Sequence, residues 1–195
     1  MASHRRITAA TAKSVSVEGA RAFLNVDHRD DDELISSLIV ASERWVESRY
    51  GLAIMSQTWR LTLDSFSLEC HYLRDGIIRL ARPPFGAVSS LSYLDTAGAS
   101  QTLTGSDYRV SDEGLDVRIE PAAGTSWPST YCVAGAVTLD HTAGSSTAEA
   151  VSPVVRLAVK DCVADRYENR EMACGPLVIA GVDALMAGEG SLAYA

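Results

Sequence analysis

Long apolar runs are absent from this sequence of 195 residues. No window reaches about 18 consecutive apolar residues, so the sequence predicts no membrane-spanning helix. The N-terminal segment MASHRRITAATAKS lacks the apolar core of a secretory signal peptide, and we expect no such leader. The four cysteines are scattered and form no CxxC pair, which favours free thiols in a reducing cytoplasm.

The sequence also lacks the common motifs of catalysis and cofactor binding. It has no GxSxG nucleophile elbow and neither a GxxxxGK[ST] nor a GxGxxG phosphate loop. A Ser–His–Asp site can assemble from distant residues, but nothing here points to one. None of the four histidines belongs to an HExxH or i, i+4 pair: His4, His28, His71 and His141. We therefore predict no catalytic residue, no cofactor and no metal ion.

An excess of positive charge is missing too, because the formal net charge is −8. This argues against a general nucleic-acid-binding protein. We prefer the interpretation that the negative charge keeps the protein soluble. An acidic protein can also line a channel through which DNA slides without being held. The acidic segment Asp27–Glu33 lacks the spaced ligands and central glycine of a calcium loop. We interpret it as compensation of the positive end of a helix.

What the sequence does contain is a clear amphipathic helix, expected from Asp31 to Gly51. Its apolar arc covers nearly half of the cylinder, which predicts a helix packed between two partners. Trp45 lies in the middle of this arc and is expected to be largely buried. The arc comprises Leu34, Ile35, Leu38, Ile39, Ala41, Trp45, Val46 and Tyr50. A shorter helix is predicted at Val17–Asn25, with Ser16 as its N-cap.

After Gly51 the apolar period changes from that of a helix to that of a strand. Trp59, Leu61 and Leu63 alternate with polar residues, as in a half-buried strand. We predict six or seven short antiparallel strands, at 57–64, 76–81, 88–94, 100–104, 108–111, 115–120 and 134–140. Residues 1–13 are interpreted as an arm or as a first edge strand.

The helical period then returns. Ser152 and Pro153 have the pattern of an N-cap followed by a helix start, and we predict a helix to about Met172 that is buried on more than one side. The predicted fold class is therefore α+β. Residues 1–55 and 150–195 form a helical core, and a β-rich antiparallel insertion, 56–149, lies between the second and third helices.

Two segments are candidates for contact with a partner. The first is the polar run from Tyr167 to Glu171, where Tyr167 and Arg170 indicate either a subunit contact or a solvated helix end. The second is the weakly charged tail, residues 177–195. It either folds back on its own helices or docks on another subunit, and only in the latter case would its deletion leave stability nearly unchanged. The tail candidates are Leu177, Val178, Val182, Leu185 and Met186.

Four stretches, in this order along the chain, resemble the head–tail connector, or adaptor, proteins of long-tailed phages and gene transfer agents. They are the helix end and QTW strand at 45–59, the RPP turn and hairpin at 78–95, the SWP segment at 126–128, and the late helix ending in YENRE at 163–171. Two regions depart from the family pattern. The loop 142–147 lacks the Gly-Tyr-Gly that the family often shows, and the tail after Gly175 matches only loosely.

The resemblance implies a non-catalytic subunit of a closed ring, commonly of twelve copies. Such a ring docks to the portal protein on one side and to a stopper or tail-completion protein on the other. DNA would pass through the channel without sequence-specific binding. The particle would be a virion or a gene transfer agent, assembled in the bacterial host cytoplasm with no membrane contact. The alternative is an enzyme or a small-ligand-binding module with a site in the β block.

Overall fold

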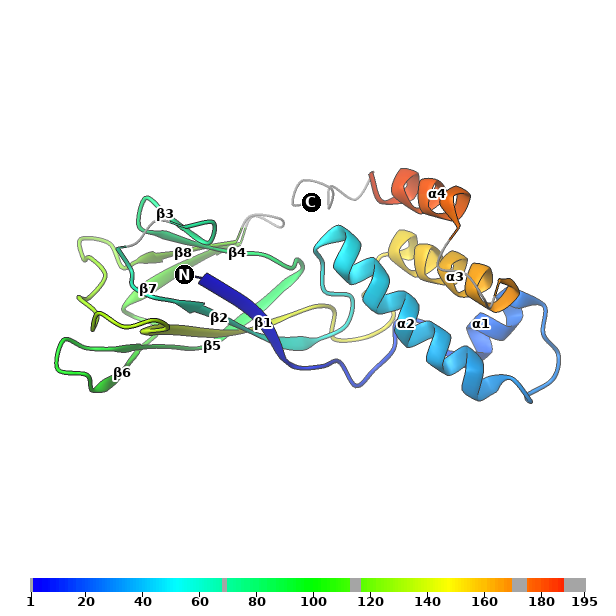
Figure 1. Ribbon diagram of the computed structural model, residues 1–195, viewed down its shortest axis with the longest axis horizontal. Helices are drawn as coiled ribbons and strands as arrows, with labels where there is room; N and C mark the ends of the chain where they lie inside the picture. Colours follow the sequence, from blue (N-terminus) through cyan, green and yellow to red (C-terminus); the bar gives the residue numbers. More distant parts are fainter. Residues whose placement is uncertain (1, 68–69, 113–116, 170–174, 188–195) are drawn as a thin grey trace. The chain divides into compact units, whose positions relative to one another are not determined.

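The computed structural model describes residues 2–67, 70–112, 117–169 and 175–187, and the chain divides into two compact units (Figure 1). We call the part made of Met1–Ala9 and Gln57–Gly144 the β unit. The part made of Ala10–Ser56 and Ser145–Ala195 is the helical unit. In the described residues there are four helices and two antiparallel sheets, with the β block between the second and third helices. The predicted α+β class is therefore confirmed.

The β unit contains one sheet of five strands and one of four. The five-stranded sheet has the order β1 (Ala2–Thr8), β2 (Gln57–Leu63), β9 (Val137–Ala143), β5 (Phe85–Leu94) and β6 (Ser100–Leu103). The four-stranded sheet has the order β3 (Leu73–Arg74), β4 (Ile77–Leu80), β8 (Val117–Pro121) and β7 (Tyr108–Asp112). Strand β1 pairs only with β2, so the N-terminal segment is an edge strand rather than an arm.

Alternation along β2 and β9 builds the core of this unit. Every second side chain of each strand is buried, and Leu61 pairs directly with Leu139. Both leucines are fully buried, together with Leu91 of β5. The strand predicted at 134–140 begins later, at Val137, because Gly135 adopts a positive φ of 75° that belongs to a turn.

The helical unit contains α1 (Val17–Leu24), α2 (Asp32–Tyr50), α3 (Pro153–Glu168) and α4 (Pro176–Ala187). The predicted caps are present: the Ser16 hydroxyl accepts a hydrogen bond from the Gly19 N–H at 3.0 Å, and Ser152 caps α3 in the same way. Helix α2 ends at Gly51, whose φ of 65° is the left-handed value that terminates helices.

Helix α2 packs against both α1 and α3, but its buried stripe is narrower than predicted. Ile35, Ile39, Val46 and Tyr50 are buried, whereas Ala41 is exposed. Trp45 is partly buried and packs against the edge of the core. Polar residues complete the stripe instead: Ser42 is buried, as is Glu47, whose carboxylate accepts the Ile54 N–H at 3.0 Å just beyond the end of the helix.

This difference in burial predicts a difference in stability. Ile39→Ala removes a fully buried side chain and is expected to lower the free energy of unfolding by about 2–5 kcal/mol. Trp45→Ala should cost less, about 1–2 kcal/mol, because the indole is only partly buried at the edge of the core. Urea unfolding of the two variants measures both values. A larger loss for Trp45→Ala than for Ile39→Ala would contradict this assignment of the helix face.

Candidate subunit-contact surface

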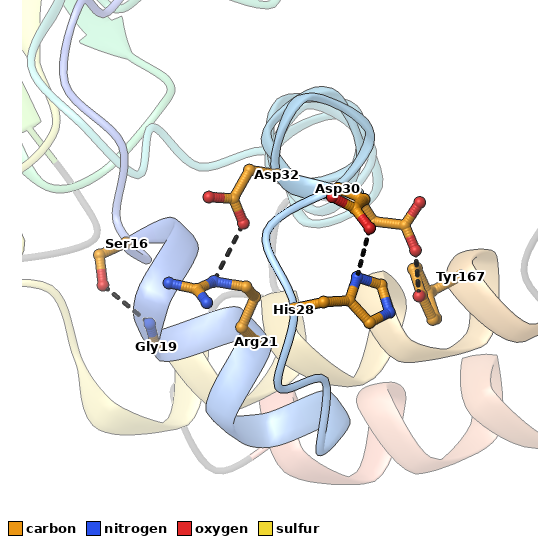
Figure 2. Close-up of polar contacts among 8 residues, drawn as sticks. Ser16, Gly19, Arg21, His28, Asp30, Asp32 and Tyr167 are labelled. Atoms are coloured by element: carbon orange, nitrogen blue, oxygen red, sulfur yellow. Dashed lines mark hydrogen bonds and ion pairs between the residues drawn. The ribbon is translucent and has the colours of Figure 1, made fainter.

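The end of α3 is tied to the start of α2. The Tyr167 hydroxyl donates a hydrogen bond to Asp31 Oδ2 at 2.6 Å, and the ring is half-buried (Figure 2). The hydroxyl of this predicted contact residue is thus engaged inside the chain. Arg170, the second candidate on this segment, lies outside the described residues.

Further polar contacts hold the link between α1 and α2 in place. Arg21 Nε lies 3.0 Å from Asp32 Oδ1, with the arginine side chain only 14% exposed, so this pair fixes α1 against the first turn of α2 (Figure 2). His28 Nδ1 lies 4.0 Å from Asp30 Oδ2, and both side chains are well exposed. That contact contributes little, because exposed ion pairs are screened by water.

Helix α4 is anchored by a polar cluster at the end of α2. Arg49 donates to both carboxylate oxygens of Asp183, from Nε at 2.8 Å and from Nη2 at 2.6 Å. The Tyr50 hydroxyl also donates to Asp183. These hydrogen bonds, from Arg49 first and then Tyr50, lower the pKa of Asp183 to about 2. Burial, followed by the bond to Asp183, raises the pKa of Tyr50 to about 12. The cluster therefore keeps its charges at all physiological pH values.

The two faces of α4 have different surroundings, although both are apolar. Val182 and Met186 are fully buried in the core of the helical unit, and Val178 packs against the same core. Leu185 is half-buried. Leu177 is 88% exposed. The exposed face continues through small residues, Ala180, Gly181 and Ala184. Helix α4 thus packs on its own chain through one face and leaves an apolar face in solvent.

A groove lies elsewhere on the helical unit, between α1 and α3. It has a volume of about 440 Å³. Its lining combines apolar or small residues with two cations and comprises Ser14, Val15, Ser16, Gly19, Pro153, Arg156, Leu157 and Lys160. Leu157 is 39% exposed here. Helix α3 nevertheless packs against α1, α2 and α4, in agreement with the expectation that it is buried on more than one side. Leu157 lies off the main apolar stripe of α3. An apolar residue at that position indicates an exposed apolar surface, but the helical period alone did not identify the groove.

The β unit carries a larger groove of about 680 Å³, lined by residues 64–67 and 127–134. Phe66 stacks on Trp127 with ring centroids 4.7 Å apart, and the Trp127 indole donates to the Gly76 carbonyl at 2.6 Å. Its one lining carboxylate, Asp64, accepts the Gly135 N–H at 2.9 Å. Within the ranges that the structure describes, no three His, Cys, Asp or Glu residues are grouped as a metal site. This groove is where the alternative ligand-binding hypothesis would place its site.

Solved structures of gene transfer agent particles contain chains with this fold. The fold matches a chain described as the neck of an empty gene transfer agent (GTA) particle computed with C6 symmetry, with a TM-score of 0.75 and 24% identity over 94% of each chain. It also matches a chain from the virion of a native GTA particle, with a TM-score of 0.73 and 25% identity, over 93% of this chain and 94% of that one. A neck of a native GTA particle computed with C12 symmetry gives a TM-score of 0.71 at 24% identity, over 94% of each chain.

No protein-family model matches the sequence, and no curated protein matches it. In the described part of the chain, no helix is long and apolar enough to cross a membrane. The fold expected from the connector resemblance is therefore the fold of chains found in the necks of GTA particles.

Proposed function

We propose that this chain is a structural subunit of the neck of a phage-like or gene transfer agent particle. In this role it forms a ring at the head–tail junction, between the portal protein and a stopper or tail-completion protein. The observation that carries the proposal is the match to GTA neck chains over 94% of both chains, which includes both the helical unit and the β unit. A shared single domain would not produce that coverage.

The four family-like stretches support the same role independently of the fold. They fall in both units, since 45–59 spans the end of α2 and the start of β2 and 163–171 includes the end of α3. Their order along the chain is that of the connector family. Agreement between a sequence resemblance and a fold match strengthens the proposal, because the two rest on different properties of the chain.

The charge of the chain suits a ring through which DNA moves. A net charge of −8 repels phosphate, so a channel built from this protein would allow DNA to slide without binding it in a sequence-specific way. We also propose that the protein is not an enzyme. In the β-unit groove the lining carboxylate of Asp64 is already engaged by a backbone N–H, and no pair of lining groups has the arrangement of an acid and a base.

Particles made with an epitope-tagged copy of this chain test the proposal. Immunogold labelling in electron micrographs is expected at the junction of head and tail, and loss of the gene should yield DNA-filled heads without attached tails. Restoring the gene should restore attachment. Label on the head shell or along the tail, or normal particles in the absence of the gene, would contradict the proposed role.

A further inference from the structure

A closed ring of identical copies needs two different and complementary patches on each copy. The helical unit offers two such patches among the described residues. The first, the α4 knob, is the exposed side chain of Leu177 with the small residues Ala180 and Gly181 beside it. The second is the α1–α3 groove described above.

The α4 knob has the properties of a contact made outside its own subunit. Leu177 is 88% exposed, whereas Val182 and Met186 on the same helix are buried in the core. The small residues Ala180 and Gly181, one turn further on, let another surface approach the helix closely. An exposed leucine alone is ordinary, but a helix with an apolar face on both sides calls for a second partner.

The α1–α3 groove has the volume and the apolar lining to accept this knob. Its volume of about 440 Å³ accommodates a leucine side chain, and Leu157 and Val15 provide apolar contacts. Arg156 and Lys160 make it basic, while the sequence of α4 contains no Lys or Arg. At the start of α4, Asp165 accepts the Gly175 N–H at 2.9 Å and offsets the positive end of the helix dipole. The knob therefore brings no positive charge that would repel the groove.

The two patches lie on different sides of the helical unit. Figure 1 shows α4 on one side of α3 and α1 on another. Leu177 is 88% exposed, so it does not fill the groove of its own copy. In a head-to-tail contact, each copy uses its knob on one neighbour and its groove on the other. An open row of copies therefore has one unused knob at one end and one unused groove at the other. If the rotation between copies closes, the result is a ring.

We propose that Leu177 of one copy inserts into the α1–α3 groove of the next copy, and that this contact joins neighbouring subunits of the ring. The choice of a second copy as the occupant rests on the proposed function, and on the C6 and C12 symmetry of the neck structures that share the fold. The contact is intrinsic to the chain, so it forms between purified copies at high concentration.

Two charged substitutions test the contact from its two sides. Leu177→Lys places an ammonium group on the knob, and Leu157→Lys places one in the groove. Sedimentation velocity of the purified protein is expected to show at least about tenfold weaker self-association for each variant than for the wild type, because an added ammonium group would have to be buried in a contact that already contains Arg156 and Lys160. Val110→Lys, at a residue of the β unit that is 40% exposed, is the matched control and should self-associate as the wild type does.

Mixing the two variants distinguishes a head-to-tail contact from a symmetric one. The Leu177→Lys copy keeps an intact groove, and the Leu157→Lys copy keeps an intact knob. An equimolar mixture should therefore form a one-to-one complex, although neither variant associates alone. Circular dichroism confirms that each variant is folded before mixing.

The proposal is overturned if the wild type remains monomeric at the highest concentration reached, if both variants associate like the wild type, or if the mixture forms no complex. These outcomes are separable from the particle experiment. If the tagged chain lies at the neck but the substitutions leave self-association unchanged, the proposed function stands and this contact is wrong. If self-association depends on Leu177 but the label lies away from the neck, the contact stands and the proposed function is wrong.

Discussion

Acidification from pH 7 to pH 5 is expected to lower the free energy of unfolding by about 2–4 kcal/mol, through two histidines of the β unit. His4 of β1 and His141 of β9 stack with ring centroids 5.2 Å apart, inside the unit. His141 is fully buried, and neither of its ring nitrogens has a hydrogen-bond partner among the residues that the structure describes. Protonation would place two positive charges side by side in this apolar environment.

Burial is the largest cause of the lowered pKa of both histidine rings. It lowers the pKa of His4 to about 3, with further contributions from His141 and Arg82. It lowers the pKa of His141 to about 4, and Asp140 opposes the shift. The aromatic neighbours Trp59, on β2, and Tyr72, just before β3, supply no negative charge that would favour the imidazolium form. Both rings are therefore neutral in the folded protein at pH 5.

The sign of the effect follows from proton binding. Between the folded pKa values of about 3 and 4 and the unfolded value of 6.5, the unfolded chain binds more protons than the folded one. Stability is thus complete above pH 6.5 and falls as the pH decreases towards 4. Glu43 of α2 acts in the opposite direction, because burial raises its pKa and its protonation favours the folded state as the pH falls.

Urea unfolding at pH 7, 6 and 5, followed by tryptophan fluorescence, measures this dependence. His141→Gln leaves one histidine of the pair and should reduce the pH-dependent loss by about half, since glutamine does not titrate. His28→Gln is the matched control, because His28 is 56% exposed and lies outside the β unit. A wild-type midpoint that does not change with pH, or equal slopes for wild type and His141→Gln, would contradict this account.

Local sequence pattern was sufficient to predict most of the elements. The alternation of Trp59, Leu61 and Leu63 predicted β2, and Ser16 and Ser152 predicted the starts of α1 and α3. These signals succeed because capping and period depend on residues close together in the chain. The α+β class followed from the change of period, since it needs no knowledge of how the elements pair.

Features that depend on distant residues were not predictable in this way. His4 and His141 belong to strands that are both paired with β2, and no local pattern brings them together. Burial of Glu47 reflects the need of the Ile54 N–H for an acceptor beyond the end of α2, which a helical wheel does not represent. The half-buried state of Trp45 has the same origin, because the wheel treats every apolar position as equivalent.

The tail shows most directly what composition alone could not predict. Apolar composition suggested contact surfaces at Leu177, Val182 and Met186 alike, yet the structure separates them into one exposed residue and two buried ones. The face of α4 that meets the core carries Val182 and Met186, and the contacts of Asp183 with Arg49 and Tyr50, more than 130 positions away, help to hold it there. Composition can identify a helix with two apolar faces, but tertiary contacts choose between them.

Deletion of residues 176–195 is expected to lower the free energy of unfolding by about 3–6 kcal/mol. The deletion removes the buried side chains of Val182 and Met186, each contributing about 1.5–3 kcal/mol, and exposes the core that they cover. It also removes the Asp183 carboxylate, which accepts three hydrogen bonds. This result is the opposite of the one expected if the whole tail served only to dock on another subunit.

Two point substitutions on the same helix separate its core face from its exposed face. Met186→Ala should cost about 2–5 kcal/mol, because it creates a cavity in the core. Leu177→Ala should change stability by no more than about 0.5 kcal/mol, because the side chain is in solvent. Urea denaturation, at a protein concentration low enough to keep the chain monomeric, gives all three values. Near-wild-type stability of the truncated protein would show that α4 does not complete the core of the isolated subunit, and equal losses for Met186→Ala and Leu177→Ala would show that its two faces are misassigned.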